Sequence, residues 1–444
     1  MLINMVAKLM ILSVLMVVQI NGMAQISEKI KKEVRNQSVF AFNLCKYLHT
    51  NPELSFQEFE TAKIISTELR KNGFEVTDNF GGNNVVGILK NGDGPVIMLR
   101  TDMDALPVEE KTGLKFASLK KSTDSKGNPV PVMHACGHDI HMSVCMGTVR
   151  SLTALKNEWK GTLIVVAQQA EEVSGGSSKA IESGLFSKFP IPDCALAFHI
   201  NPELESGTIG LVGGPVFAGV KTVEIVVYGK GGHGAYPEKC IDPIVIASRI
   251  VLDLQTIVSR EMSPLEPVVV TVGSIHGGTR PNIIPDEVKL ELSLRYYSTE
   301  AIGKVVDAIR RICKSASQMA GMPDTKLPDI KVLPVETPPV LNNVLISENL
   351  KGFASEIIGV QNVLTVKPSM VAEDFGKYGL TPEKVPICLI WLGSTSHDLL
   401  KELQAKGEKP APLHSPLLNP DYERTIETGI LVMTNNVIRL AKKK

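Results

Sequence analysis

Seven consecutive residues, Met133-His134-Ala135-Cys136-Gly137-His138-Asp139, place a thiol, two imidazoles and a carboxylate close together in the chain. Gly137 lets the backbone turn tightly between Cys136 and His138, because glycine has no Cβ. Thiol and imidazole groups at such close spacing are typical of a transition-metal site. A metal needs about three to five ligands. The chain must therefore fold so that other segments bring further ligands to this stretch.

Further metal-binding side chains follow three apolar runs that are predicted to be buried strands. The runs Val96–Arg100, Thr162–Ala167 and Cys194–Phe198 lead into Asp102 and Asp104, into Glu171 and Glu172, and into His199, respectively. Carboxylates at the end of a buried strand are costly unless a cation or protons neutralise them. Open α/β sheets place ligands at the carboxyl ends of their strands, so we expect these side chains to gather around Cys136 and His138. The flanking His134 and His141 are predicted to support the site rather than to bind metal.

The order of predicted strands and helices changes in the middle of the chain, which predicts a second domain. A length of 444 residues exceeds what one core usually supports. Strands and helices follow in the order β-α-β-β-α-β over Val223–Tyr228, Asp242–Arg260, Pro267–Gly273, Glu287–Tyr297, Thr299–Ala320 and Lys326–Val332. This order is that of a ferredoxin-like α+β domain. We therefore predict an α/β domain over 25–216 and 335–444, with residues 217–334 inserted into it.

Three further histidines lie in segments that read as loops. Gly229–Gly234 surrounds His233 with glycines but lacks the Gly-Lys-Ser/Thr ending of a phosphate-binding loop, which excludes nucleotide binding. A site role and a simple turn are equally compatible with the sequence around His233. His414 lies in a loop bracketed by prolines, which makes it a candidate for the site. His397 falls in a polar stretch, 394–408, that we interpret as a loop without a role.

Residues 1–24 predict a secretory signal peptide. Lys8 supplies positive charge, Leu9–Ile20 is a short apolar run, and small residues up to Ala24 predict cleavage before Gln25. The apolar run is shorter than the ~20 residues of a membrane-spanning helix, and an uncleaved anchor is the minor alternative. We expect a periplasmic or secreted protein, with no stable insertion in the membrane after cleavage.

The charge balance bears on nucleic-acid binding, and the cysteine count bears on the pairing of thiols. The 47 basic and 47 acidic residues give a formal net charge of zero, so the chain lacks the basic footprint of a nucleic-acid-binding protein. Seven cysteines are an odd number, so at least one thiol stays unpaired in an oxidising compartment. Cys136 is the candidate, because a metal-bound thiolate is held out of disulfide chemistry.

With these segments placed, the chain resembles the amidohydrolase branch of the aminoacylase and carboxypeptidase metallopeptidase family, which includes hippurate hydrolases and plant indole-acetyl-amino-acid hydrolases. The resemblance extends from about His49 to the last helix, and the order and spacing of its motifs make it specific. The motifs are His49 to Phe56, Arg100 to Pro107, the Cys136 stretch, Glu171-Glu172, Gly229 to Pro237, Gly277 to Pro285, Glu373-Asp374-Phe375 and Leu413-His414-Ser415-Pro416.

The resemblance implies a zinc-exopeptidase-like catalytic domain, with a mixed sheet flanked by helices, and an inserted lid domain. It implies two divalent metal ions. One thiolate with imidazoles and a carboxylate favours zinc or manganese, with cobalt or nickel as alternatives. The implied ligands are Cys136, His138, Glu172, His199 and His414. Glu171 would be the general base and Asp104 a supporting residue. His233 and Asn282 would donate hydrogen bonds to the developing oxyanion, and Arg295 would bind a substrate carboxylate. The lid could also form a homodimer.

Two residues depart from the pattern of the family. Gln169 stands where proline often precedes the Ala-Glu-Glu run, which leaves both carboxylates in place. Arg280 occupies a position that a small residue often holds, and this bears on which acyl group is accepted.

The resulting hypothesis is a metal-dependent hydrolase that cleaves the amide bond of small N-acyl or N-aminoacyl amino acids. Three alternatives stay open at this point. A dipeptidase or carboxypeptidase would use the same site, a cysteine hydrolase would use Cys136 as its nucleophile, and a binding protein would lack catalysis. Retention of Glu171 together with all the candidate ligands argues against the last of these.

Overall fold

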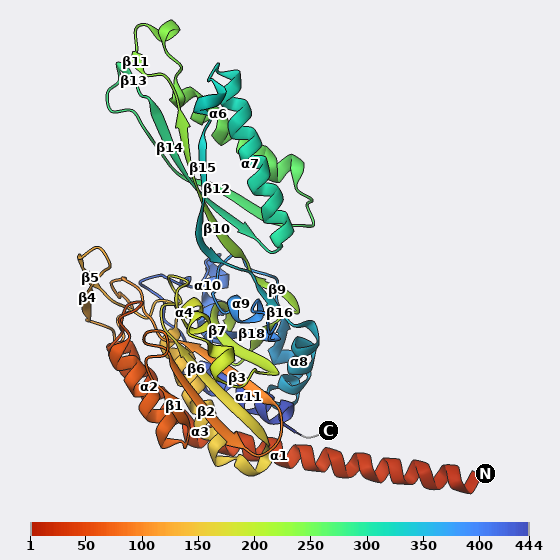
Figure 1. The fold of residues 1–444 in the computed structure, drawn as a ribbon. Helices are drawn as coiled ribbons and strands as arrows, with labels where there is room; N and C mark the ends of the chain where they lie inside the picture. The colour runs from red at the N-terminus through yellow and green to blue at the C-terminus, as the bar shows by residue number, and fades with distance from the viewer. Residues whose placement is uncertain (1, 443–444) are drawn as a thin grey trace. The chain divides into compact units, whose positions relative to one another are not determined.

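The computed structural model describes the backbone of residues 2–442 and the side chains of residues 25–334 and 337–442. It divides into two compact units (Figure 1). Unit 1 comprises Met1–Gly214, Asn342–Lys367 and Tyr378–Lys444, and unit 2 comprises Pro215–Leu341 and Pro368–Lys377. The predicted signal peptide, 1–24, lies outside the residues whose side chains are described. Within the described part of the chain, no helix combines the length and apolar character needed to cross a membrane.

A mixed sheet of eight strands forms the centre of unit 1. Its strand order is β1 (Glu75–Thr77), β2 (Val85–Asn91), β6 (Gly161–Gln168), β3 (Val96–Asp102), β7 (Cys194–Glu205), β18 (Ile387–Thr395), β8 (Ile209–Leu211) and β17 (Val363–Thr365). The four central strands β6, β3, β7 and β18 run parallel, whereas β1 and β2 pair antiparallel at one edge. The predicted α/β class with a mixed central sheet is confirmed.

Helices cover this sheet. They are α1 (Leu2–Thr50), α2 (Phe59–Lys71), α3 (His138–Ala154), α4 (Gly176–Glu182), α5 (Leu185–Lys188), α8 (Val344–Ile358), α10 (His397–Lys406) and α11 (Tyr422–Leu440), and the short α9 (Gly376–Gly379) crosses the division between the units. Helix α3 packs against β3 and β7 on one side and against α1 and α11 on the other. Every side chain of α3 from His138 to Val149 is buried as a result. The first turn of α3 therefore lies away from water.

The register of the paired strands aligns the polar residues at the ends of β3 and β6 with His199 of β7. Asp102 at the end of β3 pairs with Gln168 at the end of β6, and Arg100 of β3 pairs with Ala197 of β7. Two residues further along, Asp102 is therefore level with His199. The prediction that β7 ends before His199 was wrong. β7 continues through Glu205 because the neighbouring strand β18 pairs with it that far.

The predicted loop around His397 was also wrong, because this segment forms α10. The hydroxyl of Ser396 accepts a hydrogen bond from the backbone N–H of Leu399 at the first turn, and Gly407 ends the helix in the left-handed region. A serine cap and a terminal glycine are ordinary helix signals. Nδ1 of His397 lies 2.8 Å from Oε2 of Glu205 on the protein surface.

Unit 2 contains an antiparallel sheet in the order β12 (Val268–Gly277), β14 (Glu287–Tyr296), β10 (Gly219–Tyr228) and β15 (Asp329–Thr337). Helices α6 (Pro243–Thr256) and α7 (Thr299–Met319) lie on one face of it (Figure 1). Alternate side chains of β14 are buried, as expected for a strand with one covered face. The predicted ferredoxin-like order is confirmed. Short two-stranded ladders complete the chain, formed by β4 (Lys121–Thr123) with β5 (Pro129–Pro131), β9 (Gly214–Phe217) with β16 (Val340–Asn342), and β11 (Gly232–His233) with β13 (Ile283–Ile284).

Candidate metal centre

Gly137 makes the turn that leads into α3. Its backbone is left-handed, with φ 80° and ψ 21°, directly before the helix begins at His138. Glycine is required there for two reasons. The backbone conformation is unfavourable for other residues, and an added Cβ would lie 2.3 Å from Cδ1 of Ile200 on β7. The turn allows the buried side chains of Cys136 and His138 to approach each other with a single residue between them.

The side chains predicted as metal ligands lie in two overlapping groups. The groups are Cys136 with His138 and His199, and Cys136 with Glu172 and His414; within each, one donor atom per residue lies within 4.8 Å of the others. A further group of the same kind joins His138 to Glu171 and Glu172. Cys136 belongs to the first two groups and connects them. We call these five residues, Cys136, His138, Glu172, His199 and His414, the metal cluster.

Individual distances in the metal cluster fit shared coordination. Sγ of Cys136 is 3.5 Å from Nε2 of His199, and Nε2 of His138 is 3.8 Å from Oε1 of Glu172. Nε2 of His414 is 3.4 Å from Oε2 of Glu172. Ligands of one zinc ion lie about 2.0–2.3 Å from it, so two ligands of the same ion can be about 4.5 Å apart at most. Each of these pairs can therefore bind one ion with only small movements.

Backbone carbonyls set the tautomers of two histidines in the cluster. Nδ1 of His138 donates to the carbonyl oxygen of Asp104, and Nδ1 of His199 donates to that of Ile200, both at 2.8 Å. In the neutral imidazoles the lone pair is then on Nε2, which is the atom that faces the cluster. Nε2 of His138 is buried and has no hydrogen-bond partner in the described part of the chain. A cation bound there would satisfy it, so the residues present fit a metal.

His141 is close enough to form a third group with Asp102 and His138, but its hydrogen bonds exclude it as a ligand. Its Nδ1 donates to Oδ1 of Asp102 at 2.7 Å, and its Nε2 accepts from the backbone N–H of Ile200 at 2.9 Å. Both ring nitrogens are therefore engaged. Asp102 is held in turn by Nη1 of Arg100 at 2.6 Å. This arrangement gives His141 a supporting place beside the cluster.

Buried negative charge dominates the electrostatics of the centre. Burial, reinforced by the carboxylates of Glu172 and Glu171, raises the pKa of the Cys136 thiol well above its usual value. Burial disfavours a charged imidazole at His138, yet the surrounding carboxylates, Asp102 foremost, outweigh it and raise the His138 pKa to about 10. A nucleophilic cysteine needs electropositive surroundings that lower its pKa. The surroundings of Cys136 are the opposite, and they favour the binding of cations.

Asp104 supports the two glutamates through their backbone. Its carboxylate accepts the N–H groups of Glu171 and Glu172, both at 3.0 Å, and the hydroxyl of Ser55 donates to it at 2.6 Å. Neither Ser55 nor the buried Glu58, whose Oε1 accepts the N–H of Ala170 at 2.7 Å, was recognised individually from the sequence. The available signal was their place in the motif from His49 to Phe56 and just beyond it.

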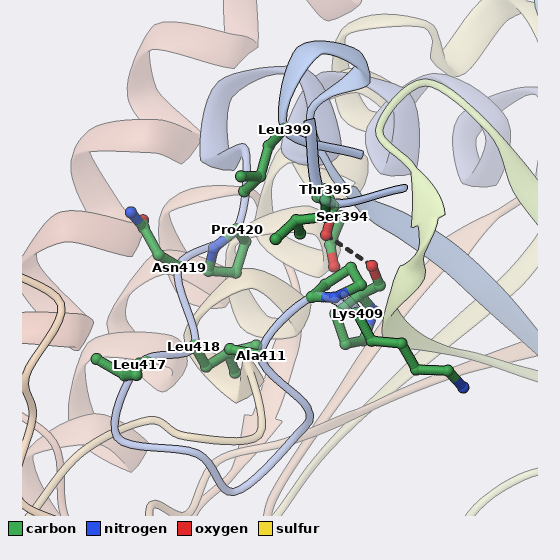
Figure 2. A pocket seen from close by; sticks show the side chains of 12 residues that line it. Ser394, Thr395, Leu399, Lys409, Ala411, Leu417, Leu418, Asn419 and Pro420 are labelled. Carbon is green, nitrogen blue, oxygen red and sulfur yellow. Dashed lines mark hydrogen bonds between the residues drawn. The ribbon is translucent and has the colours of Figure 1, made fainter. Parts of the chain in front are cut away.

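His414 comes from the loop between α10 and α11. Its backbone is left-handed, with φ 66°, and its N–H donates to the carbonyl of Ala135 at 2.7 Å, which ties the loop to the Cys136 stretch. Its side chain is 52% exposed, whereas Glu172, its partner in the cluster, is buried. A separate cavity of about 150 Å³ lies against the same loop, and Figure 2 shows side chains that line it. That cavity is lined mainly by Pro202, Leu399, Leu403, Leu417, Leu418 and Pro420, and by no residue of the metal cluster.

The remaining predicted residues belong to unit 2. His233 is exposed on β11, and its Nδ1 accepts the backbone N–H of Ala235 at 3.0 Å. The carbonyl of Asn282 accepts the N–H of Gly234 at 2.9 Å, so Asn282 lies beside the His233 segment within this unit. Arg295 is half-buried on β14, and its guanidinium donates to the carbonyl of Met370 at 3.4 Å.

Comparison with known proteins identifies the family. The model of peptidase family M20/M25/M40 matches residues 98–403. The chain belongs to this family. It is 36% identical over 354 residues to N-acetylcysteine deacetylase of Bacillus subtilis, which covers 79% of this chain and 87% of that protein. It is 31% identical over 406 residues to the IAA-amino acid hydrolase ILR1-like 4 of Arabidopsis thaliana, which covers 91% of this chain and 87% of that one.

A solved structure supports the same assignment. The crystal structure of a dinuclear metal-binding peptidase of the M20 family from Bacillus subtilis matches this M20 chain with a TM-score of 0.74 and 30% identity. The match covers 92% of this chain and 99% of the other. The predicted recognition of the amidohydrolase branch is confirmed, and the chain is a metal-dependent amidohydrolase or peptidase that acts on amide bonds.

The Gly137 turn generates a testable expectation. Gly137→Ala should weaken metal binding about 10–100-fold, the range seen when groups that orient ligands are removed, because the clash with Ile200 displaces Cys136 and His138. Isothermal titration of the metal-free protein with zinc would measure this.

Gly127→Ala is the matched control for that titration. Gly127 also has a positive φ, of 85°, but an added Cβ would meet nothing within 4 Å. Zinc affinity should be unchanged in the control. Equal affinities in both variants would show that the turn does not position the ligands.

Proposed function

We propose that this M20 protein hydrolyses the amide bond of small N-acyl or N-aminoacyl amino acids by means of two divalent metal ions. The observation that carries the proposal is the pair of ligand groups that share Cys136, with the carboxylate of Glu171 within 4.8 Å of His138 and Glu172. Cys136, His138, Glu172, His199 and His414 would hold the ions. When bound, such ions lower the pKa of a water molecule and polarise the amide carbonyl.

Glu171 is the general base in this proposal. Its carboxylate is buried, and Oε2 lies 3.9 Å from Nε2 of His138, at the inner edge of the metal cluster. It would take a proton from the attacking water and pass that proton to the departing amine, as a positioned carboxylate does in general acid–base catalysis. Asp104 assists by fixing the backbone of the loop that carries Glu171.

His233, Asn282 and Arg295 of unit 2 bind the substrate in this proposal. Because Nδ1 of His233 accepts the N–H of Ala235, the proton of the neutral ring is on Nε2. That N–H can donate to a carbonyl oxygen as it becomes negative, and the amide of Asn282 would add a second donor. The guanidinium of Arg295 would bind the carboxylate of the amino-acid part of the substrate.

A dipeptidase or carboxypeptidase activity is the main alternative on the same site. Acyl amino acids are preferred as substrates because the chain is 36% identical to a protein named N-acetylcysteine deacetylase. A panel of N-acetyl, N-benzoyl and indole-acetyl amino acids beside dipeptides separates the two. Faster turnover of dipeptides throughout the panel would replace the proposal with the alternative. A Cys136 nucleophile is disfavoured by the negative surroundings of its thiol.

The donor set is compatible with several divalent metals. One thiolate with imidazoles and carboxylates suits zinc, and manganese, cobalt and nickel are alternatives that geometry and supply decide between. Reconstitution of the metal-free protein with each ion, one at a time, would rank them by activity.

Export and self-association complete the proposal. Residues 1–24 would be removed as a signal peptide, so that the mature protein begins at Gln25 in the periplasm or outside the cell. Mass spectrometry of the exported protein would detect an intact N-terminus if this is wrong.

A homodimer through unit 2 has a suitable surface, since β12 is an edge strand and α6 exposes Val245 and Leu252. Light scattering would measure the mass in solution.

Substitution of the proposed base tests the mechanism. Glu171→Gln should reduce kcat by at least about 10²-fold, because the amide cannot accept the proton of the water. The metal content should stay at the wild-type value. Steady-state kinetics would measure kcat, and elemental analysis would measure the metal content.

Two variants complete the comparison. Glu182→Gln, on the exposed side of α4, should leave kcat unchanged. If instead Glu171→Gln loses metal while Glu172→Gln retains it, the roles of the two glutamates are the reverse of those proposed.

Substitution in unit 2 tests the proposed oxyanion donor. His233→Ala should lower kcat about 10²–10³-fold, the usual cost of losing one such donor, without a change in metal content. His276→Ala is the matched control, because His276 is an exposed histidine on β12 of the same unit. Similar activity of the two variants would remove His233 from the mechanism.

A further inference from the structure

The loop from Ala170 to Gly176 carries both Glu171 and Glu172, and its backbone is not relaxed. Ala170 and Ser174 have positive φ angles, of 50° and 54°, although neither is glycine. Residues other than glycine adopt this conformation only where the surroundings impose it. The position of the Glu171 carboxylate therefore depends on whatever holds the loop in this shape.

Buried carboxylates accept three successive N–H groups of the loop. Oε1 of Glu58 accepts the N–H of Ala170 at 2.7 Å, and Asp104 accepts those of Glu171 and Glu172, both at 3.0 Å. The second oxygen of Glu58 is held by the side-chain amide of Asn83 at 3.2 Å. The side chain of Glu58 is completely buried, so its bonds to the loop are not exchanged with water.

The C-terminal end of the loop is held by the aromatic ring of Phe56 rather than by a charged group. Phe56 packs so closely on Gly175 that a Cβ at that glycine would lie 2.5 Å from Cζ of the ring. Phe56 itself has a positive φ, of 65°, which directs the chain from Ser55 toward Glu58. Phe56 is 45% exposed, so burial in the core does not account for the position of its ring.

Residues 53–58, which include Ser55, Phe56 and Glu58, are themselves held in place by neighbouring elements. The carbonyl of Glu53 accepts the N–H of Ala105 at 2.8 Å, and Leu54 and Ala105 form an isolated bridge. The carboxylate of Glu53 accepts the N–H of Thr61 at 2.8 Å in the first turn of α2. The hydroxyl of Ser55 donates to Asp104. The segment thus connects α2, the end of β3 and the glutamate loop.

We propose that Ser55, Phe56 and Glu58 form a positioning clamp that holds the loop of Glu171 and Glu172 in its strained shape, and that the position of the general base depends on it. The proposal rests on the proposed role of Glu171. The three residues do not touch the reacting atoms. They act through the loop, at Ala170, at the Asp104 carboxylate and at Gly175.

Three variants test the clamp in the full chain loaded with zinc. Glu58→Ala should lower kcat for N-acetyl amino acids about 10–100-fold, because a displacement of about 1 Å at the reacting groups has a cost of this size. KM should change less than about twofold, and with zinc in excess the metal content should not change, although Glu172 lies on the same loop. Glu58→Gln should recover most of kcat, since its carboxamide oxygen can accept the N–H of Ala170. Gln57→Ala is the matched control, because the side chain of Gln57 hydrogen-bonds to Ser122 and Thr123 of the β4–β5 hairpin rather than to the loop.

Hydrogen exchange of the loop gives a readout that does not need activity. Amides of residues 170–176 should exchange faster in Glu58→Ala, and also in Phe56→Ala if Glu58→Ala does not fold, while Gln57→Ala matches the wild type. Unchanged exchange in the clamp variants overturns the proposal, as does faster exchange with unchanged kcat. A wild-type protein inactive on every acyl amino acid would overturn the proposed function, whereas the exchange rates alone would still decide whether the clamp holds the loop.

Discussion

Buried negative charge at the carboxyl edge of the unit 1 sheet is the constraint on which the site depends. Asp102, Asp104, Glu171 and Glu172 lie around Cys136 and His138 in a region almost closed to water. Carboxylates in such a place need compensating positive charge, because burial alone would keep them protonated. The carboxylates around His138, Asp102 foremost, raise its pKa to about 10, which accords with a region that favours positive charge. A site with this charge balance is suited to divalent metals, which accords with the M20 family to which the chain belongs.

The supporting contacts divide into those that orient ligands and those that hold backbone. Carbonyl groups of Asp104 and Ile200 direct the imidazoles of His138 and His199, and the Gly137 turn brings Cys136 beside them. A different set of contacts holds the glutamate loop, and Asp104 takes part in both sets, through its carbonyl for His138 and through its carboxylate for the loop. Asp104 therefore links the orientation of a ligand to the placement of the proposed base. Loss of such outer contacts commonly lowers metal affinity by about 10–100-fold.

Much of this could be predicted from the sequence because it is local. The apolar strands, the polar residues at their ends and the β-α-β-β-α-β order of unit 2 are patterns within short segments, and the fold class followed from them. The errors came from tertiary effects. β7 extends past His199 only because β18 lies beside it, and the composition of the α10 segment concealed the Ser396 cap. Glu58 could not be recognised as a partner of Ala170, because residues 112 positions apart carry no mutual signal in a single sequence.

The most direct test of the account is the metal content per chain of the purified mature protein, measured together with hydrolysis of N-acyl amino acids before and after chelation. The account predicts about two ions per chain, as in two-metal hydrolases, with activity lost to a chelator and restored by a divalent metal. Protein that binds no metal, keeps its activity in chelator and loses it to a thiol reagent would contradict the account and assign the chemistry to Cys136.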